Sequence, residues 1–153
     1  MYIIKFLRLD PRSQKPYKGY SDDAGWDLFT CGDCDIPAGE TVDVHTGISL
    51  DMPKDVYCRL TGRSSTLRTH RLLVNEGIID SGFTGELYLS IHNLSDHVFH
   101  VKHGMRLGQM LFHRVEDVRF EETDHIQLTV NGRNNRGYGS TGTGDDIRGE
   151  QNG

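Results

Sequence analysis

A short stretch near the C-terminus, residues 133–142, has the composition of an anion-binding site. It reads Arg-Asn-Asn-Arg-Gly-Tyr-Gly-Ser-Thr-Gly and so combines two cations, one aromatic ring and three glycines. Glycine lets backbone N–H groups approach an anion closely, and arginine adds a planar fork that matches phosphate oxygens. Tyr138 offers a face on which a nucleobase could stack. The stretch therefore indicates a nucleotide phosphate site, and a disordered Gly/Asn-rich tail is the alternative.

Four earlier segments also place charged, amide or hydroxyl side chains close to glycine. They span residues 24–28, 62–65, 77–87 and 104–109. Asp80 is a carboxylate that could act as a general base, and Ser64 is a hydroxyl at a predicted helix start, where anions bind. Taken singly, each residue has a plainer interpretation: Asp80 as a turn residue, Ser64 as a helix cap and Gln109 as an exposed strand residue.

The elements that must position these residues are mostly strands. Six runs show alternating polarity or clustered β-branched residues, which predicts strands. The runs are residues 3–9, 41–50, 56–60, 86–92, 98–101 and 110–115. Many short strands separated by turn signals are typical of an all-β barrel or jelly roll. Residues 64–71 instead predict one short helix, with Ser64 or Ser65 as its N-cap.

The composition is that of a globular protein and argues against broad nucleic-acid binding. The 153 residues are 35% hydrophobic and 25% charged, which suits one domain with its own core. The net charge of −5 and the pI near 5.9 exclude a broad cationic surface for DNA or RNA, so no nucleic-acid partner is expected. A single small polyanion held by a few local arginines remains compatible with this balance.

No apolar stretch approaches the length of a membrane span and no signal-peptide pattern is present, so no membrane partner is expected. Three cysteines, an odd and low number, indicate a cytoplasmic location, or the host cytoplasm for a viral protein. Cys31 and Cys34 form a lone C-x-x-C pair, which supplies at most half of a zinc site. His97, His100 and His103 recur every third residue, so on an extended strand they alternate faces and do not converge.

Taken together and in this order, the five segments closely resemble the five motifs of the homotrimeric dUTPase family, along residues 24–142. The resemblance implies cleavage of dUTP between the α- and β-phosphates to dUMP and pyrophosphate, which keeps uracil out of DNA and supplies dUMP for thymidylate synthesis. It implies an all-β fold over residues 1–130, a jelly-roll-like distorted β-barrel with one short helix. Residues 131–153 are expected to form a flexible C-terminal arm.

The resemblance also gives the motif residues expected roles. Asp80 matches the aspartate that holds and activates the attacking water and contacts the sugar 3′-hydroxyl. Ser64, with Arg63 and Ser65, matches the motif that holds the α- and β-phosphates. Gln109 matches a further phosphate contact.

Asp27 matches the aspartate that organises neighbouring side chains and the water shell of a metal ion. Mg²⁺ is the expected cofactor, held by the triphosphate and water near Asp27 without a direct protein ligand. The expected assembly is a homotrimer in which each dUTP site draws on several subunits.

Residues 75–78, among them Asn75, Gly77 and Ile78, match the hairpin that reads uracil through its backbone groups. Fixed main-chain donors reject cytosine strongly because mispaired buried polar groups are costly. Phe83 falls beneath the deoxyribose, where the family usually has tyrosine, and its ring would exclude a 2′-hydroxyl by shape. A place for Phe83 in the hydrophobic core is the alternative.

The C-terminal arm matches the fifth motif. Arg133 aligns with the arginine that grips the γ-phosphate, and Tyr138 replaces the usual phenylalanine over uracil. Gly139, Ser140 and Thr141 complete the expected clamp on the outer phosphates. The arm is therefore expected to act as a lid over the site.

The nearest relatives of dUTPases, the dCTP deaminases, share the Arg-Ser-Ser start at residues 63–65 followed by Arg68. Their essential glutamate lies ten residues beyond the motif-three aspartate, where this chain has Ser90, which cannot shuttle protons as a carboxylic acid does. Glu86 is nearby but out of register. The prediction is therefore a dUTP diphosphatase. A nucleotide-sensing or partner-binding module on the same fold, and a structural jelly roll, are the alternatives; the latter does not account for residues 133–142.

Overall fold

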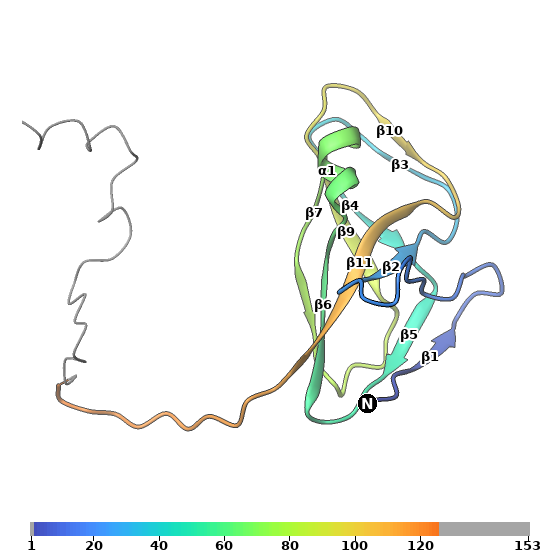
Figure 1. Cartoon of the computed structure of the whole chain (residues 1–153). Helices are drawn as coiled ribbons and strands as arrows, with labels where there is room; N and C mark the ends of the chain where they lie inside the picture. Colours follow the sequence, from blue (N-terminus) through green and yellow to red (C-terminus); the bar gives the residue numbers. More distant parts are fainter. Residues whose placement is uncertain (1, 126–153) are drawn as a thin grey trace, which may run out of the picture. The chain divides into compact units, whose positions relative to one another are not determined.

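Strands make up nearly all of the regular structure in residues 2–125, which are the residues that the computed structural model describes (Figure 1). In chain order the elements are β1 (Lys5–Arg8), β2 (Trp26–Phe29), β3 (Cys34–Ile36), β4 (Thr41–His45), β5 (Ile48–Asp51), β6 (Val56–Gly62), α1 (Ser64–His70), β7 (Leu72–Val74), β8 (Gly77–Ile79), β9 (Tyr88–Asn93), β10 (Phe99–Val101) and β11 (Arg106–Arg114). The predicted fold class, an all-β jelly roll with one short helix, is confirmed.

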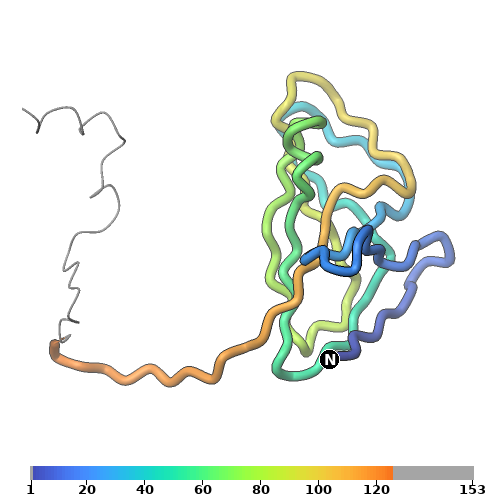
Figure 2. Tube along the Cα trace, viewed as in Figure 1, coloured from blue at the N-terminus to red at the C-terminus, as the bar shows by residue number. Residues whose placement is uncertain are grey.

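The strands pair in four antiparallel sheets. Their orders are β1-β5, β10-β3, β2-β11-β6-β8 and β4-β9-β7. In the tube of Figure 2, β10 runs alongside β3, as their pairing requires. The four-stranded sheet carries most of the site, because its register places Gln109 opposite both Asp27 on β2 and Thr61 on β6. Three segments far apart in the sequence therefore meet at one level of this sheet.

A bulge in β11 decides which of its side chains face the core. The register against β2 shifts between Arg106 and Gly108. Leu107 and Met110 are both buried, although strict alternation would put them on opposite faces. The bulge accommodates both apolar side chains inside and leaves Arg106 exposed beside β2.

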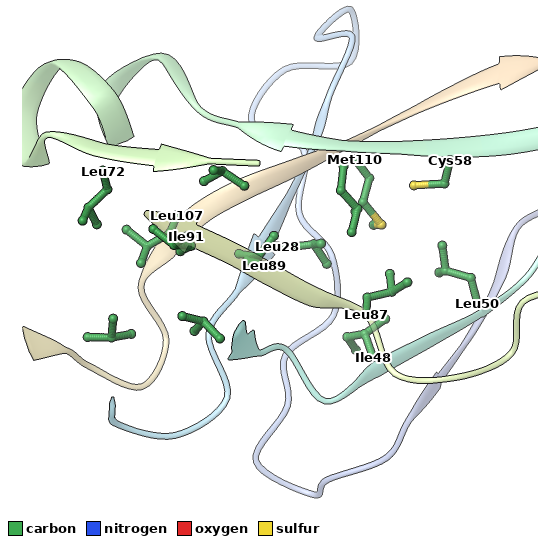
Figure 3. Close-up of a cluster of buried hydrophobic side chains, with 14 of the residues drawn as sticks. Leu28, Ile48, Leu50, Cys58, Leu72, Leu87, Leu89, Ile91, Leu107 and Met110 are labelled. Atoms are coloured by element: carbon green, nitrogen blue, oxygen red, sulfur yellow. The ribbon is translucent and has the colours of Figure 1, made fainter. Parts of the chain in front are cut away.

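The buried side chains of these sheets form one apolar core (Figure 3). Leu28, Leu89 and Leu107 are among its fully buried members, and Leu28 lies beside Leu89 in that view. The packing is tight at Gly108, where a Cβ atom would lie 2.4 Å from Cδ2 of Leu89. Burial of apolar surface stabilises a fold by about 25 cal/mol per Å², so this core holds the strands in their register.

The predicted strand over residues 41–50 is wrong as a single element. The chain forms β4 and β5 instead, and the break falls at Gly47, whose φ of 65° is left-handed and suits glycine. The preceding residue, Thr46, is buried and donates a hydrogen bond from Oγ1 to the carbonyl oxygen of Leu87 at 2.6 Å. Because β4 pairs with β9 and β5 pairs with β1, the two halves belong to different sheets.

The predicted hairpin at residues 75–78 is also wrong. β7 pairs with β9 while β8 pairs with β6, so these consecutive strands lie in different sheets. Val74 and Ile79 both pack against the core, each from its own sheet. Asn75 marks the crossing, and its N–H donates to the carbonyl oxygen of Ser90 at 2.8 Å.

The predicted helix is confirmed, but its predicted N-cap is wrong. Arg63 occupies the N-cap position with φ −81° and ψ 155°, and no side chain caps the helix. Arg63 directly follows β6, and its guanidinium turns to the carboxylate of Asp27 rather than to the helix. Ser64 and Ser65 are therefore the first residues inside α1, where their hydroxyls do not cap it.

Residues from Val118 onward form a second unit, of which residues 118–125 are described. These residues contain neither helix nor strand, and Oγ1 of Thr123 donates to the carbonyl oxygen of His125 at 2.9 Å. Within residues 2–125, no helix has both the length and the apolar character needed to cross a membrane.

Candidate active site

The carboxylate of Asp27 joins two arginines that come from different elements. Its Oδ1 lies 2.7 Å from Nε of Arg63, and its Oδ2 lies 3.1 Å from Nη1 of Arg106. The Asp27 side chain is only 15% exposed, so these contacts are shielded from water. Arg63 also donates from Nη1 to the carbonyl oxygen of Arg106 at 3.2 Å. One carboxylate between two guanidinium groups leaves an excess positive charge, which suits an anionic ligand.

Gln109 lies at the same level of the sheet and completes this group. Its Nε2 donates to the carbonyl oxygen of Gly62 at 2.9 Å, and Gly62 directly precedes Arg63 in the chain. The side chain fits because residue 25 is glycine: a Cβ on Gly25 would lie 2.3 Å from Oε1 of Gln109. Residues from the first, second and fourth segments therefore meet in one net-cationic cluster of Asp27, Arg63, Arg106 and Gln109.

The start of α1 is fixed beside this cluster. Thr66 is buried, and its Oγ1 donates to the carbonyl oxygen of Leu107 at 2.8 Å, which ties the helix to β11. Ser64 is exposed and Ser65 is half-buried, and both follow Arg63 directly. The two serines therefore lie in the first turn of α1, directly after Arg63.

Asp80 and Phe83 lie on an exposed turn that follows β8. The N–H of Phe83 donates to the carbonyl oxygen of Asp80 at 3.0 Å, and Oγ of Ser81 donates to the carbonyl oxygen of Lys54 at 3.5 Å. The Phe83 side chain is 45% exposed, and its Cζ would lie 2.7 Å from a Cβ on Gly85. A core position for Phe83 is therefore excluded by its exposure, and its ring lies over a glycine at the surface.

One chain does not bring Asp80 to the net-cationic cluster. Ile79 pairs with Cys58, so Asp80 follows at the level of Tyr57, whereas Arg63 follows Gly62 at the other end of β6. Six residue steps separate Tyr57 from Arg63, which is about 20 Å along an extended chain. The predicted site residues of a single chain therefore form two separate groups.

The segment expected to read uracil lies at the edge of a sheet. Gly77 pairs with Leu60 and Ile78 with Arg59, and β8 has no second strand partner among the described residues. The Ile78 side chain is exposed, as is that of Asn75. An edge strand keeps one row of backbone donors and acceptors unpaired, which is the arrangement that backbone recognition of a base requires.

Sequence reasoning missed three charged residues beside these groups. Arg106 lies within the fourth segment, residues 104–109, and this position was the sequence feature that could have identified it. Glu76 accepts a hydrogen bond from Nη2 of Arg59, which holds the pKa of the Glu76 carboxyl below its ordinary value. Oγ1 of Thr61 also donates to Glu76, at 3.4 Å, so the turn into β8 is tied to β6. No periodicity or motif in the sequence predicts the pair of Arg59 and Glu76.

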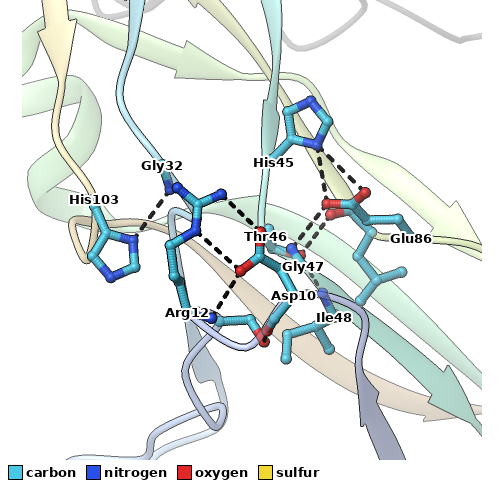
Figure 4. A network of polar contacts seen from close by, with 11 residues as sticks. Asp10, Arg12, Gly32, His45, Thr46, Gly47, Ile48, Glu86 and His103 are labelled. Carbon is cyan, nitrogen blue, oxygen red and sulfur yellow. Dashed lines mark hydrogen bonds and ion pairs between the residues drawn. The ribbon is translucent and has the colours of Figure 1, made fainter.

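Glu86 is not available as a substitute for the deaminase glutamate. Its carboxylate accepts the N–H of Gly47 at 2.9 Å and lies 3.2 Å from Nδ1 of His45 (Figure 4). A hydrogen bond to Glu86 also raises the pKa of Tyr88. Glu86 is therefore committed to the junction of β4 and β5, and Ser90 stands where the deaminases have their acid.

The cysteine pair and the histidine series form no metal centre in the part of the chain described. No group of three or more His, Cys, Asp or Glu side chains there could hold an ion. Cys31 and Cys34 are free, and burial raises the pKa of both thiols. His97 and His100 face separate aspartates, Asp96 and Asp35 respectively, while His103 accepts the N–H of Gly32.

A family model described as dUTPase matches residues 12–142 of the chain. The chain belongs to the dUTPase family. The deoxyuridine 5'-triphosphate nucleotidohydrolase of Gloeothece citriformis is 34% identical over 141 residues, which cover 91% of this chain and 96% of that protein. The human mitochondrial deoxyuridine 5'-triphosphate nucleotidohydrolase is 32% identical over 139 residues, which cover 91% of this chain and 54% of the human protein.

Solved dUTPase structures share the fold. The dUTPase of Staphylococcus bacteriophage 80alpha with dUPNHPP aligns with a TM-score of 0.84 at 19% identity, over 92% of this chain and 98% of the phage chain. A variant dUTPase from phage phi11 of S. aureus aligns with a TM-score of 0.77 at 17% identity, over 82% of this chain and 99% of that chain.

The dUTPase-family match reaches into residues that lie outside those the structure describes. Five predicted site residues fall there: Arg133, Tyr138, Gly139, Ser140 and Thr141. Their roles, and the division of the chain at residue 130, stay predictions. The other predicted site residues lie in the described part, either at the cluster around Asp27 or on β8 and the segments that flank it.

Proposed function

We propose that this dUTPase-family chain hydrolyses dUTP to dUMP and pyrophosphate. The observation that carries the proposal is the dUTPase model's match to residues 12–142, within which Asp27, Arg63, Arg106 and Gln109 form a net-cationic cluster. The relatives named above are nucleotidohydrolases of deoxyuridine 5'-triphosphate, and the 80alpha enzyme was solved with dUPNHPP. A triphosphate is the anion that such a cluster could hold in several places at once.

The net-cationic cluster would bind the α- and β-phosphates, and it is called the phosphate-facing cluster below. Arg63 presents its planar guanidinium, and Ser64 and Ser65 add hydroxyl donors beside it. Gln109 contributes its amide, which the contact with Gly62 orients. Asp27 acts through the arginines, because both of its oxygens are engaged by guanidinium groups.

Asp80 would be the general base. Its carboxylate is exposed on the turn after β8 and could take a proton from a water that attacks the α-phosphorus in line with the leaving pyrophosphate. The P–O bond to the β-phosphate breaks, and pyrophosphate leaves with that electron pair. Backbone groups of residues 75–78, including Gly77 and Ile78, would read uracil, and Phe83 would lie beneath the deoxyribose.

A homotrimer with shared sites would unite the two groups of residues. Asp80 and the phosphate-facing cluster lie at opposite ends of β6, so Asp80 of one copy would act with the cluster of another. A closed ring with threefold symmetry repeats such a heterologous contact at each of its interfaces. Residues 131–153, with Arg133, Tyr138 and the Gly139–Thr141 turn, would then close over the outer phosphates and the base.

Mg²⁺ fits this site as an ion held by the substrate. In the phage phi11 dUTPase variant a structural Mg(II) ion is coordinated. Here no three-ligand carboxylate or histidine group occurs within residues 2–125, and Asp27 is the acidic member of the phosphate-facing cluster. Mg²⁺ usually keeps several waters and binds substrate phosphates, so Asp27 would meet it through water. The ion would neutralise phosphate charge.

The three free cysteines support a reducing cytoplasmic location.

The test is pyrophosphate release from dUTP, dCTP, dTTP and UTP with Mg²⁺. Strong preference for dUTP is expected, and ammonia release from dCTP would overturn the proposal in favour of a deaminase. Asp80→Asn should stop hydrolysis while dUTP still binds. Persistence of a biological role in that variant would favour the nucleotide-sensing alternative.

A further inference from the structure

The segment that precedes β2 places an aromatic ring against the phosphate-facing cluster. The N–H of Tyr17 donates to the carbonyl oxygen of Asp27 at 3.1 Å, and the N–H of Asp27 donates to the carbonyl oxygen of Tyr17 at 2.7 Å. This isolated antiparallel bridge lies outside the pairing of β2 with β11. The Tyr17 backbone is therefore fixed to the residue whose carboxylate holds the two arginines.

The ring of Tyr17 meets one of those arginines. Cζ of Arg106 lies 5.8 Å from the centre of the ring, within the range of a cation–π contact. The same guanidinium is bound through Nη1 to Asp27 Oδ2 at 3.1 Å. Arg106 is thus held from two directions, by a carboxylate and by an aromatic face, and both belong to residues joined by the backbone bridge.

This arrangement matters because Arg106 is the more exposed of the two arginines. Its side chain is 42% exposed, against 28% for Arg63. A long side chain at that exposure samples many rotamers unless something orders it. Tyr17 and Asp27 both contact the Arg106 guanidinium and so limit the rotamers that it can adopt.

We propose that Tyr17 is a positioning residue that, with Asp27, holds Arg106 beside Arg63 as the second cationic arm of the phosphate site. The inference rests on the proposed function for its substrate, a nucleoside triphosphate. Tyr17 itself touches Arg106 and Asp27, and it acts on the phosphates through Arg106.

A neighbouring residue of the same type offers a matched control. Tyr20 belongs to the same segment, is 74% exposed, and has no cation–π contact in the part of the chain described. Its backbone N–H donates to Oδ2 of Asp23 at 2.9 Å and not to a member of the cluster. Tyr20→Ala removes a comparable aromatic side chain without touching Arg106.

The experiment compares Tyr17→Ala, Tyr17→Phe and Tyr20→Ala in steady-state hydrolysis of dUTP. Tyr17→Ala should raise KM by about threefold to tenfold with kcat within about twofold, as loss of a cation–π contact predicts. Tyr17→Phe keeps the ring and should match the wild type, as should Tyr20→Ala. In an Arg106→Ala background, Tyr17→Ala should have no further effect. An unchanged KM for Tyr17→Ala, an equal effect of Tyr20→Ala, or additivity with Arg106→Ala would each overturn the proposal.

Two measurements keep the outcomes separate. If Tyr17→Ala fails to fold, Tyr17→Leu keeps the bulk without the aromatic face and should show the same rise in KM. Titration calorimetry with inorganic pyrophosphate reads the phosphate site directly, and Tyr17→Ala should weaken it by a similar factor. If the wild type binds pyrophosphate but does not hydrolyse dUTP, the proposed function fails. The inference about Tyr17 is then still tested by comparing the pyrophosphate affinities of the wild type and Tyr17→Ala.

Discussion

Arg63 and Asp27 form an ion pair at 2.7 Å between Nε and Oδ1, although Arg63 is the N-cap of α1 and Asp27 lies on the edge strand β2. Asp27→Asn keeps the shape of the side chain but removes the charge that draws in both Arg63 and Arg106. We expect kcat/KM for dUTP to fall about 10-fold to 100-fold, the scale of losing charge-assisted hydrogen bonds. Steady-state kinetics of dUTP hydrolysis by Asp27→Asn measure this change in kcat/KM.

The matched control for that variant is Asp51→Asn. Asp51 pairs with Lys5 at 3.3 Å, and both side chains are mostly exposed, so solvent screens the pair. Its kcat/KM should equal that of the wild type. Equal losses in the two variants would show that the role assigned to Asp27 is wrong.

Gly25 gives room to Gln109, and its replacement should act through that side chain. A Cβ in Gly25→Ala would lie 2.3 Å from Oε1 of Gln109, and the amide would have to move away from Gly62. We expect kcat/KM to fall about 5-fold to 20-fold, with unfolding free energy within about 1 kcal/mol of the wild type. The double variant Gly25→Ala/Gln109→Ala should be no worse than Gln109→Ala alone. A further loss in the double variant would mean that Gly25 serves another purpose.

Gly108→Ala tests the packing of the core instead of the chemistry. The new Cβ would lie 2.4 Å from Cδ2 of Leu89, a fully buried side chain with little room to move. Overpacking of this kind costs about 1–3 kcal/mol, which urea unfolding would register as a lower midpoint. Gly77→Ala, whose Cβ would come no closer than 3.8 Å to Leu60, should change the unfolding free energy much less.

Subunit mixing tests whether Asp80 and Arg63 of different copies act together. Asp80→Asn and Arg63→Ala should each be nearly inactive alone. If each site uses Asp80 from one subunit and Arg63 from another, random mixed trimers made by refolding the two variants together should recover about a quarter of wild-type activity. Pyrophosphate release measures this recovery. Mixed samples that stay inactive, while size measurements show a trimer, would indicate that the two groups act within one chain.

The buried thiol of Cys58 gives the fold a dependence on alkaline pH. Cys58 is fully buried, and burial raises its pKa from 9.0 to about 12. The unfolded chain loses this proton at lower pH than the folded chain does, so stability falls as the pH rises from 9 towards 12. The thiol's share of the loss is at most about 1.4 kcal/mol per pH unit. Urea unfolding from pH 8 upward should show a shallower decline for Cys58→Ala; an identical slope would assign the decline to other groups.

The sequence alone was sufficient to predict an all-β fold, and it singled out candidate site residues by their type and spacing. Alternating runs predicted the strands that became β6, β9 and β10, because alternation is a local property of each half-buried strand. Four short strands, β2, β3, β7 and β8, lay outside the predicted runs, and each is a strand because it pairs with β11, β10, β9 or β6 respectively. The break at Gly47 was hidden for a related reason: the alternation continues across it while the backbone turns into another sheet.

Tertiary structure alone decided how the site residues combine. The residue types of Asp27, Arg63 and Gln109 followed from the sequence, but the ion pair of Asp27 with Arg106 depends on the register of β2 against β11. The exposure of Phe83 and the distance of Asp80 from Arg63 depend likewise on which sheet each strand joins. Such pairings are set by burial of the whole core and not by neighbours in the chain, so the sequence determined which chemistry is present, and the packing decided which groups share a site.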